Sequence, residues 1–151
     1  MLEVDVVRIS VIVPIYNVKL YIERCVRSLM EQTLENIEFI FVNDCTPDDS
    51  MDILHYVLEE YPKRREQIKI IEHETNRGIS AVRNTGLKNA TGQYIIYCDS
   101  DDWVEKNMYE KLLVKALETS ADIVGCDFFD DYVAHSTIRK QLFPQQSEKC
   151  V

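Results

Sequence analysis

The stretch "RISVIVPI" (residues 8–15) decides the fold, together with "IEFIFVN" (37–43) further along the chain. Both runs are rich in β-branched or aromatic residues and stay apolar at nearly every position, as strands covered on both faces of a sheet require. The segment between them, "VKLYIERCVRSLMEQ" (18–32), repeats apolar residues at helical spacing. This order predicts two neighbouring strands of a parallel sheet joined by a crossover helix.

The same alternation continues to about residue 129. We expect further helices in 46–61, 79–90 and 105–120 and further strands in 67–73, 92–98 and 122–129. Such alternation predicts an α/β fold with a mostly parallel, doubly wound sheet. After about Asp131 the periodicity fades. Residues 1–131 are therefore predicted to form one ligand-binding domain, and residues 132–151 a loose tail or the start of a further segment.

Charge and composition exclude several classes of protein. The 151 residues carry a formal net charge of -9 and no basic stripe, which argues against a nucleic-acid-binding surface. The five cysteines have no metal-type spacing, and their odd number rules out a complete set of disulfides within one chain. No apolar run approaches the roughly 20 residues that cross a bilayer. Reduced thiols and a soluble, cytoplasmic protein are expected.

Ligands of open parallel sheets bind beyond the carboxyl ends of the strands, so functional residues are expected directly after each predicted strand. These segments are "PIYN" (14–17), "NDCTPDD" (43–49), "ETNRG" (74–78) and "DSDD" (99–102). Asn17 is interpreted as the cap of the first crossover helix. Thr46 and Pro47 are typical of a helix start. Asp44 lies ahead of that start, at the strand end, where it can reach a ligand.

The segment "YCDSDDW" (97–103) places three carboxylates in four positions directly after an apolar strand. Such charges repel one another unless solvent, hydrogen bonds or a cation relieves them. Mg²⁺ and Mn²⁺ typically take one or two carboxylates together with phosphate oxygens. An isolated Asp-x-Asp is more often a solvated loop, but its position between a strand and a helix favours a metal site.

Glycine-rich phosphate loops are absent from this sequence. The four glycines form neither GxGxxG nor GxxxxGK. The charge of a phosphate ester would therefore have to be met by a divalent cation and by arginines, of which Arg77 and Arg83 are the nearest candidates. Arg83 could organise the carboxylates of Asp44 and Asp99 or hold an anionic ligand.

Four segments in this order, "VIVPIYN", "FIFVNDCTPDDS", "NRGISAVRNTG" and "YIIYCDSDDW", resemble the inverting family 2 glycosyltransferases. The resemblance covers about residues 8–128. It implies the GT-A fold of nucleotide-diphospho-sugar transferases and, for this chain, their N-terminal donor-binding domain. It also implies transfer of a hexose-like sugar from a nucleotide diphosphate, usually UDP, with Mn²⁺ or Mg²⁺. The acceptor would be a saccharide or a lipid-linked molecule, often in the synthesis of a bacterial surface polysaccharide.

The resemblance also implies roles for individual residues. By matching positions, Pro14 and Tyr16 line the base and ribose, and Asp44 meets the uracil edge. The family often has Asp-Asp-Gly-Ser after the second strand, whereas this chain has Asn43 in place of the first acid and Cys45 in place of the glycine.

The arginine and the acidic segment complete the implied site. Arg83 assists nucleotide binding, Asp99 touches the ribose, and Asp101 of the DxD motif holds the metal. The general base of such enzymes lies well beyond the metal-binding triplet, so it is expected past the end of this chain, and no residue is nominated for it.

Two functions remain open on this evidence, a glycosyltransferase and a donor-binding module without turnover. A phospho-acceptor signalling domain is disfavoured because it needs an acidic pair after the first strand, and a nucleotidyltransferase because its phosphate loop is missing. The expected location is the cytoplasm, with association at the inner face of the membrane through segments outside this chain.

Overall fold

The computed structural model describes residues 9–132 and 135–140. Two compact units divide the chain, Met1–Leu113 and Val114–Val151. The predicted functional division at residue 131 stays a prediction, and residues 133–134 and 141–151 of the predicted tail lie outside the described residues. None of the helices in the described ranges is both long and apolar enough to span a bilayer.

The first unit contains a four-stranded parallel sheet with the order β3-β2-β1-β4. Its strands are β1 (Ile9–Ile15), β2 (Ile37–Asn43), β3 (Ile68–Glu72) and β4 (Tyr94–Tyr97). All of β1 is buried, and so is β2 up to its last residue. The predicted parallel α/β sheet is confirmed, with β1 and β2 as its two inner strands.

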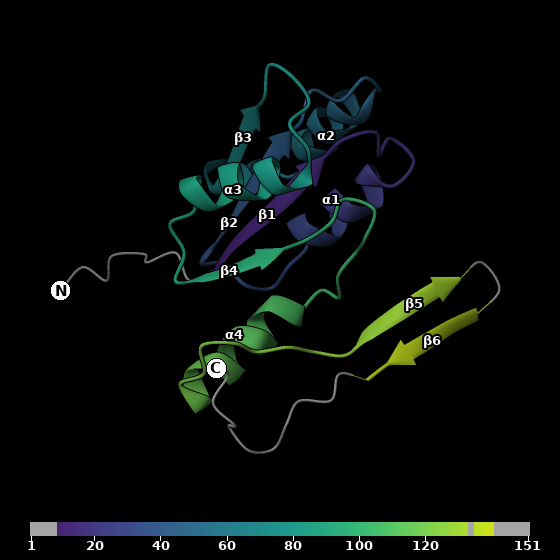
Figure 1. Cartoon of the computed structure of the whole chain (residues 1–151). Helices are drawn as coiled ribbons and strands as arrows, with labels where there is room; N and C mark the ends of the chain where they lie inside the picture. The colour runs from purple at the N-terminus through teal and green to yellow at the C-terminus, as the bar shows by residue number, and fades with distance from the viewer. Residues whose placement is uncertain (1–8, 133–134, 141–151) are drawn as a thin grey trace. The chain divides into compact units, whose positions relative to one another are not determined.

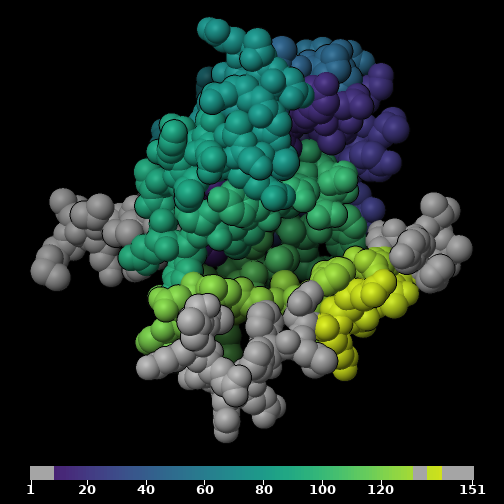
Figure 2. Space-filling model, in the orientation of Figure 1, coloured from purple at the N-terminus to yellow at the C-terminus, as the bar shows by residue number. Residues whose placement is uncertain are grey.

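Helices cover both faces of this sheet (Figure 1). α1 (Ile22–Met30) and α2 (Ser50–Glu59) contact each other on one face, and α3 (Ile79–Asn89) lies on the other. A short 3-10 helix, η1 (Pro62–Gln67), precedes β3, and α4 (Met108–Thr119) follows β4. In the space-filling view, the teal atoms of the chain around α3 cover much of the visible face (Figure 2).

The two-residue period of β1 divides the core between these helices. Val11 and Val13 belong to the larger core cluster, which includes Leu29 of α1 and Leu54 of α2. Ile12 points the other way, into a smaller cluster with Val82 of α3. α3 lies so close to β1 that a Cβ atom on Gly86 would come 2.3 Å from Cγ2 of Ile12. A glycine is therefore required at that position of the helix.

α1 and α2 each begin four residues later than the sequence predicted. The amides of residues 17–19 donate to the side chains of Thr46, Ser50 and Asp48 at 2.7, 3.1 and 3.0 Å. These side chains therefore bind the loop after β1. Asp48 also accepts the amide of Ser50, the first residue of α2, at 3.2 Å, whereas the N-cap residue Asp49 makes no side-chain cap hydrogen bond. Asn17 does not cap α1 either, since its φ is 55° and the helix begins at Ile22.

The second unit differs from the expectation of one more strand in 122–129. Its strand β5 (Phe128–Tyr132) begins six residues later and pairs antiparallel with β6 (His135–Arg139) in a separate two-stranded sheet. The predicted strand was wrong in its position because Asp122, Gly125 and Asp127 interrupt the apolar pattern. β6 lies where the sequence pattern indicated no element.

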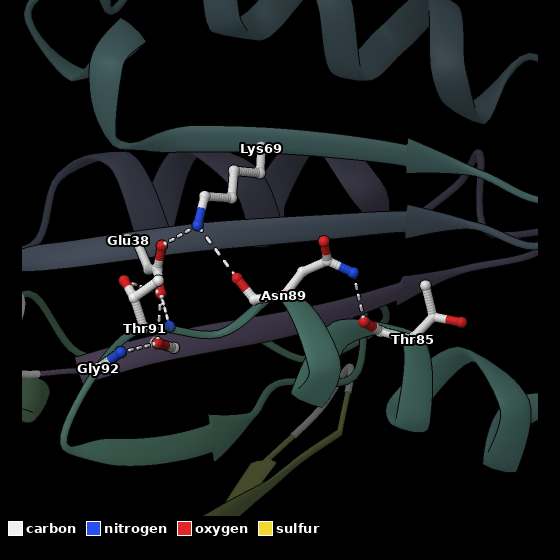
Figure 3. Close-up of polar contacts among 7 residues, drawn as sticks. Glu38, Lys69, Thr85, Asn89, Thr91 and Gly92 are labelled. Carbon is white, nitrogen blue, oxygen red and sulfur yellow. Dashed lines mark hydrogen bonds and ion pairs between the residues drawn. The ribbon is translucent and has the colours of Figure 1, made fainter.

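A buried carboxylate fixes the amino end of the sheet. Glu38 on β2 pairs with Lys69 on β3 at 2.7 Å and accepts hydrogen bonds from the Ser10 hydroxyl at 2.6 Å and the Thr91 amide at 2.6 Å (Figure 3). The Ser10 hydroxyl in turn accepts from the amide of Gly92 at 2.8 Å. The loop before β4 is therefore tied to both inner strands.

Hydrogen bonding controls the ionisation of Glu38. Burial acts to raise the pKa of Glu38, but the bonds from Lys69, Ser10 and Thr91 outweigh it and lower the pKa from 4.5 to about 2. A carboxylate with a lowered folded-state pKa stabilises the fold above its unfolded pKa. That contribution is lost as the pH falls from about 4.5 towards about 2.

We therefore predict that Glu38→Gln lowers the free energy of unfolding at pH 7 by roughly 1 to 3 kcal/mol, because the ion pair and one strong acceptor are lost. The difference from the wild type should narrow as the pH falls below about 4.5. Urea unfolding at a series of pH values measures both effects. Glu59→Gln, an exposed change at the end of α2, is the matched control. A difference independent of pH would contradict the assignment.

Candidate functional site

The carboxyl ends of the four parallel strands lie at one edge of the sheet. The strands end at Ile15, Asn43, Glu72 and Tyr97, each within one residue of the predicted end. Because β1 lies between β2 and β4, the residues after all three strands border the same edge. The chain runs outwards from β1 to β3 and then crosses to β4, so the order of strands reverses beside β1, where ligands of such sheets bind.

Arg83 of α3 and Asp99 after β4 form an ion pair at this edge. Nη2 of Arg83 lies 2.9 Å from Oδ1 of Asp99. The guanidinium also lies over the ring of Tyr97, 5.5 Å from its centroid. The Nε of Arg83 is buried and makes no hydrogen bond with the described residues. Arg83 therefore pairs with Asp99, one of the two carboxylates that it was predicted to organise, whereas the Asp44 side chain is bound by His73 and by the amides of Arg77 and Gly78.

Repulsion persists within the acidic segment despite the ion pair of Asp99 with Arg83. Burial raises the pKa of Asp102, and the charges of Asp101 and Asp99 raise it further. Asp101 itself is exposed. Among the described residues, no three His, Cys, Asp or Glu side chains are grouped so that they could hold a metal ion. The carboxylates fit a cation such as Mg²⁺ or Mn²⁺ only as one or two ligands, with the other oxygens coming from water or a bound phosphate.

Asp44 is buried at the end of β2, with both oxygens hydrogen-bonded. Oδ1 lies 2.7 Å from Nδ1 of His73 and accepts the amide of Arg77 at 2.9 Å, and Oδ2 accepts the amide of Gly78 at 2.8 Å. Burial acts to raise the pKa of Asp44, but the bonds from His73, Arg77 and Gly78 lower it. Asp44 thus anchors the turn before α3, where Gly78 has a φ of 82°. Direct contact of Asp44 with a nucleotide base stays a prediction.

His73 is a residue that the sequence analysis did not select. It follows β3 directly, as Asp44 follows β2, and its position after a strand was the available signal. An ionised carboxylate only accepts, so Nδ1 of His73 carries the proton donated to Asp44. Nε2 lies 2.8 Å from the hydroxyl oxygen of Thr85 on α3, within hydrogen-bond distance. His73 therefore links the ends of β2 and β3 to α3.

The two candidates from the first strand lie in different environments. Pro14 is buried within β1, opposite Val42 of β2. Tyr16 comes directly after the strand and is 48% exposed. Tyr16 is therefore accessible to a ligand, whereas the Pro14 side chain is buried. The contacts predicted for both with a nucleotide stay predictions.

This fold and site define a class, the α/β domains of the GT-A type, in which a parallel sheet presents acidic residues at its carboxyl edge. Comparison with known proteins identifies the family. The profile of Glycosyl transferase family 2 matches residues 10–149, so the chain belongs to that family.

Several known proteins are similar to this chain. It is 45% identical over 140 residues to the uncharacterized glycosyltransferase EpsJ of Bacillus subtilis, a match that covers 93% of this chain and 38% of EpsJ. The crystal structure of S. aureus TarS in complex with UDP matches with a TM-score of 0.67 and 32% identity, over 76% of this chain and 33% of that one. The mannosyltransferase PcManGT from Pyrobaculum calidifontis, in complex with GDP-Man and Mn²⁺, matches with a TM-score of 0.65 and 26% identity, over 76% of this chain and 32% of that one. The chain thus spans about a third of the length of these relatives.

The anchoring role of Asp44 gives a prediction. Asp44→Asn replaces one acceptor oxygen with a donor group that faces other donors, so we expect a loss of roughly 2 to 4 kcal/mol in the free energy of unfolding. Amide hydrogen exchange at Arg77 and Gly78 should also become faster than in the wild type. Asp49→Asn serves as the control, because Asp49 is an exposed aspartate at the N-cap of α2 whose side chain makes no cap hydrogen bond. Unchanged exchange at both amides would show that Asp44 does not hold the turn.

Proposed function

We propose that this chain binds a nucleotide diphosphate sugar, with UDP as the nucleotide, at the carboxyl edge of its sheet. The observation that carries the proposal is the pairing of Arg83 with Asp99 beside Asp101 and Asp102, where repulsion between carboxylates raises the pKa of Asp102. The structures that match include one with UDP and one with GDP-Man and Mn²⁺, which supports a nucleotide-sugar donor and a divalent cation.

The proposed roles follow from where the residues lie. Tyr16 is exposed after β1 and offers a ring face to the base or ribose. Asp99, held by Arg83, accepts hydroxyl hydrogens of the ribose. Asp101 is exposed and would hold Mn²⁺ or Mg²⁺, which when bound neutralises the charge of the leaving diphosphate. Arg83 would assist nucleotide binding from α3, where its Nη2 pairs with Asp99 and its buried Nε–H makes no hydrogen bond with the described residues.

The family supports transfer of the sugar, with inversion, to a saccharide or lipid-linked acceptor on the cytoplasmic side of a bacterial membrane. A general base would have to deprotonate the acceptor hydroxyl. A donor-binding role without turnover is the second candidate, because no residue of the described ranges is assigned as that base. Release of UDP from UDP-sugars in the presence of an acceptor panel distinguishes the two.

The role of the cation can be tested by calorimetry. UDP should bind more tightly with Mn²⁺ or Mg²⁺ than with chelator, because the cation offsets repulsion between the diphosphate and the acidic cluster. Asp101→Ala should remove that difference. Asp52→Ala, an exposed aspartate on α2, should preserve it. Equal affinity for UDP with metal and with chelator in the wild type would exclude the cation.

The role of Tyr16 is tested separately, since stacking of an aromatic ring on a base does not need the cation. Tyr16→Ala should weaken UDP binding by roughly tenfold, in line with about 1 to 3 kcal/mol for one stacked base. Tyr16→Phe should retain most of the affinity. Tyr56→Ala removes a similarly exposed ring from α2 and should leave the affinity unchanged. If Tyr16→Ala binds UDP as the wild type does, the base lies elsewhere.

A further inference from the structure

The segment that carries the acidic cluster, residues 98–107, contains neither helix nor strand. It connects β4 to α4, and its carboxylates repel one another. A segment of this kind needs bonds to a rigid element if its side chains are to stay in one place. These bonds come from α1 and from Gln32 and Thr33, which lie just beyond the end of that helix.

Two α1 side chains contact the main chain of this segment. The thiol of Cys25 lies 3.8 Å from the carbonyl oxygen of Asp99. One helical turn later, the hydroxyl of Ser28 accepts the amide of Val104 at 3.2 Å. Residues three apart share a helix face, so one side of α1 contacts the segment at both ends of the acidic cluster.

Gln32 makes the most complete set of bonds. Its side chain is almost fully buried, with the residue 3% exposed. Nε2 donates to the carbonyl oxygens of Ser28 at 3.1 Å and Glu105 at 2.8 Å, while Oε1 accepts the amide of Tyr109 in the first turn of α4 at 3.3 Å. One amide group therefore joins the end of α1, the end of the acidic segment and the start of α4.

Neighbouring contacts act in the same direction. The amide of Thr33 donates to the carbonyl oxygen of Lys106 at 3.0 Å. The guanidinium of Arg24 lies 4.4 Å from the ring centroid of Trp103, within the range of a cation–π interaction. α1 is itself packed into the core through Leu29 and Met30, so these contacts attach the segment to a rigid helix.

We propose that Gln32 and Ser28 are positioning residues, which hold the main chain around Asp99 and Asp101 in the place that cation and donor binding require. The part of this inference that concerns the cation rests on the proposed function. The part that concerns the position of the segment does not, because every bond involved lies within the protein.

Trp103 is the single tryptophan of the chain and lies within the segment, so its fluorescence reports on the segment directly. In metal-free protein, Gln32→Met should shift the emission of Trp103 and increase its quenching by acrylamide. It should also speed amide exchange in residues 99–105. With UDP present, the affinity for Mn²⁺ should fall by roughly tenfold or more, as changes behind metal ligands typically cause.

A matched control removes an equivalent amide elsewhere. Asn89 donates from Nδ2 to the carbonyl oxygen of Thr85 at 2.9 Å, at the end of α3. Asn89→Leu should therefore leave Trp103 emission, exchange in 99–105 and Mn²⁺ affinity within about twofold of the wild type. A general loss of stability would affect both variants alike, whereas a positioning role affects only Gln32→Met.

A second pair of variants keeps the inference testable if Gln32→Met does not fold. Ser28→Ala removes the acceptor of the Val104 amide, and Ser28→Thr retains a hydroxyl. Exchange in 99–105 should rise in the first and return towards wild type in the second. Wild-type exchange in residues 99–105 and wild-type quenching of Trp103 in Ser28→Ala, and in Gln32→Met where it folds, would overturn the inference. If the wild-type protein binds UDP equally with and without Mn²⁺, the proposed role of the cation is excluded. Altered quenching of Trp103 in Gln32→Met would in that case still support the positioning of the segment by Gln32.

Discussion

The buried strand β1 is the element on which the rest of the structure depends. It pairs with β2 on one side and β4 on the other, and its side chains supply both core clusters. Parallel pairing places the carboxyl ends of β1, β2 and β4 at one edge, so residues from three distant parts of the sequence meet there. The close approach of α3 to β1 at Gly86 brings Arg83, three residues earlier, to the same edge.

Carboxylates serve two different purposes in this domain. Glu38 and Asp44 are buried, have several donors each and have lowered pKa values, so their charge stabilises the fold. Asp101 and Asp102 lie in a segment whose main chain is held by α1, but the pKa of Asp102 is raised by burial and by its acidic neighbours. Charge that costs free energy in the absence of a ligand is typical of a binding site, whereas compensated charge is typical of structure.

The acidic segment, residues 98–107, is held in place by residues from other parts of the chain. Short β4 holds only one end of it, and α1 holds the remainder through Ser28 and Gln32. The main chain of the segment is therefore fixed while the Asp101 side chain stays exposed. A site that must bind a charged ligand gains from such preorganisation, because little conformational entropy remains to be lost on binding.

The sequence by itself determined the order of most helices and strands, the parallel sheet, and the edge of the sheet at which a ligand is expected to bind. It could do so because burial on both faces imposes apolar runs, and crossover helices impose their own period. The pairing of Arg83 with an acidic residue was also predictable, since Asp99 lies just after β4 and Arg83 lies in the first half of α3, near the same edge. Only the tertiary structure decided that Asp44 is bound to His73 and the Arg77–Gly78 turn, that the Asp48 side chain holds the loop after β1, and that Gln32 reaches Glu105. These bonds join residues about 30 to 70 positions apart, and a local pattern carries no signal for a partner so distant. The hairpin of β5 and β6 was missed for a related reason: its strands carry too many polar residues for the apolar pattern to mark them.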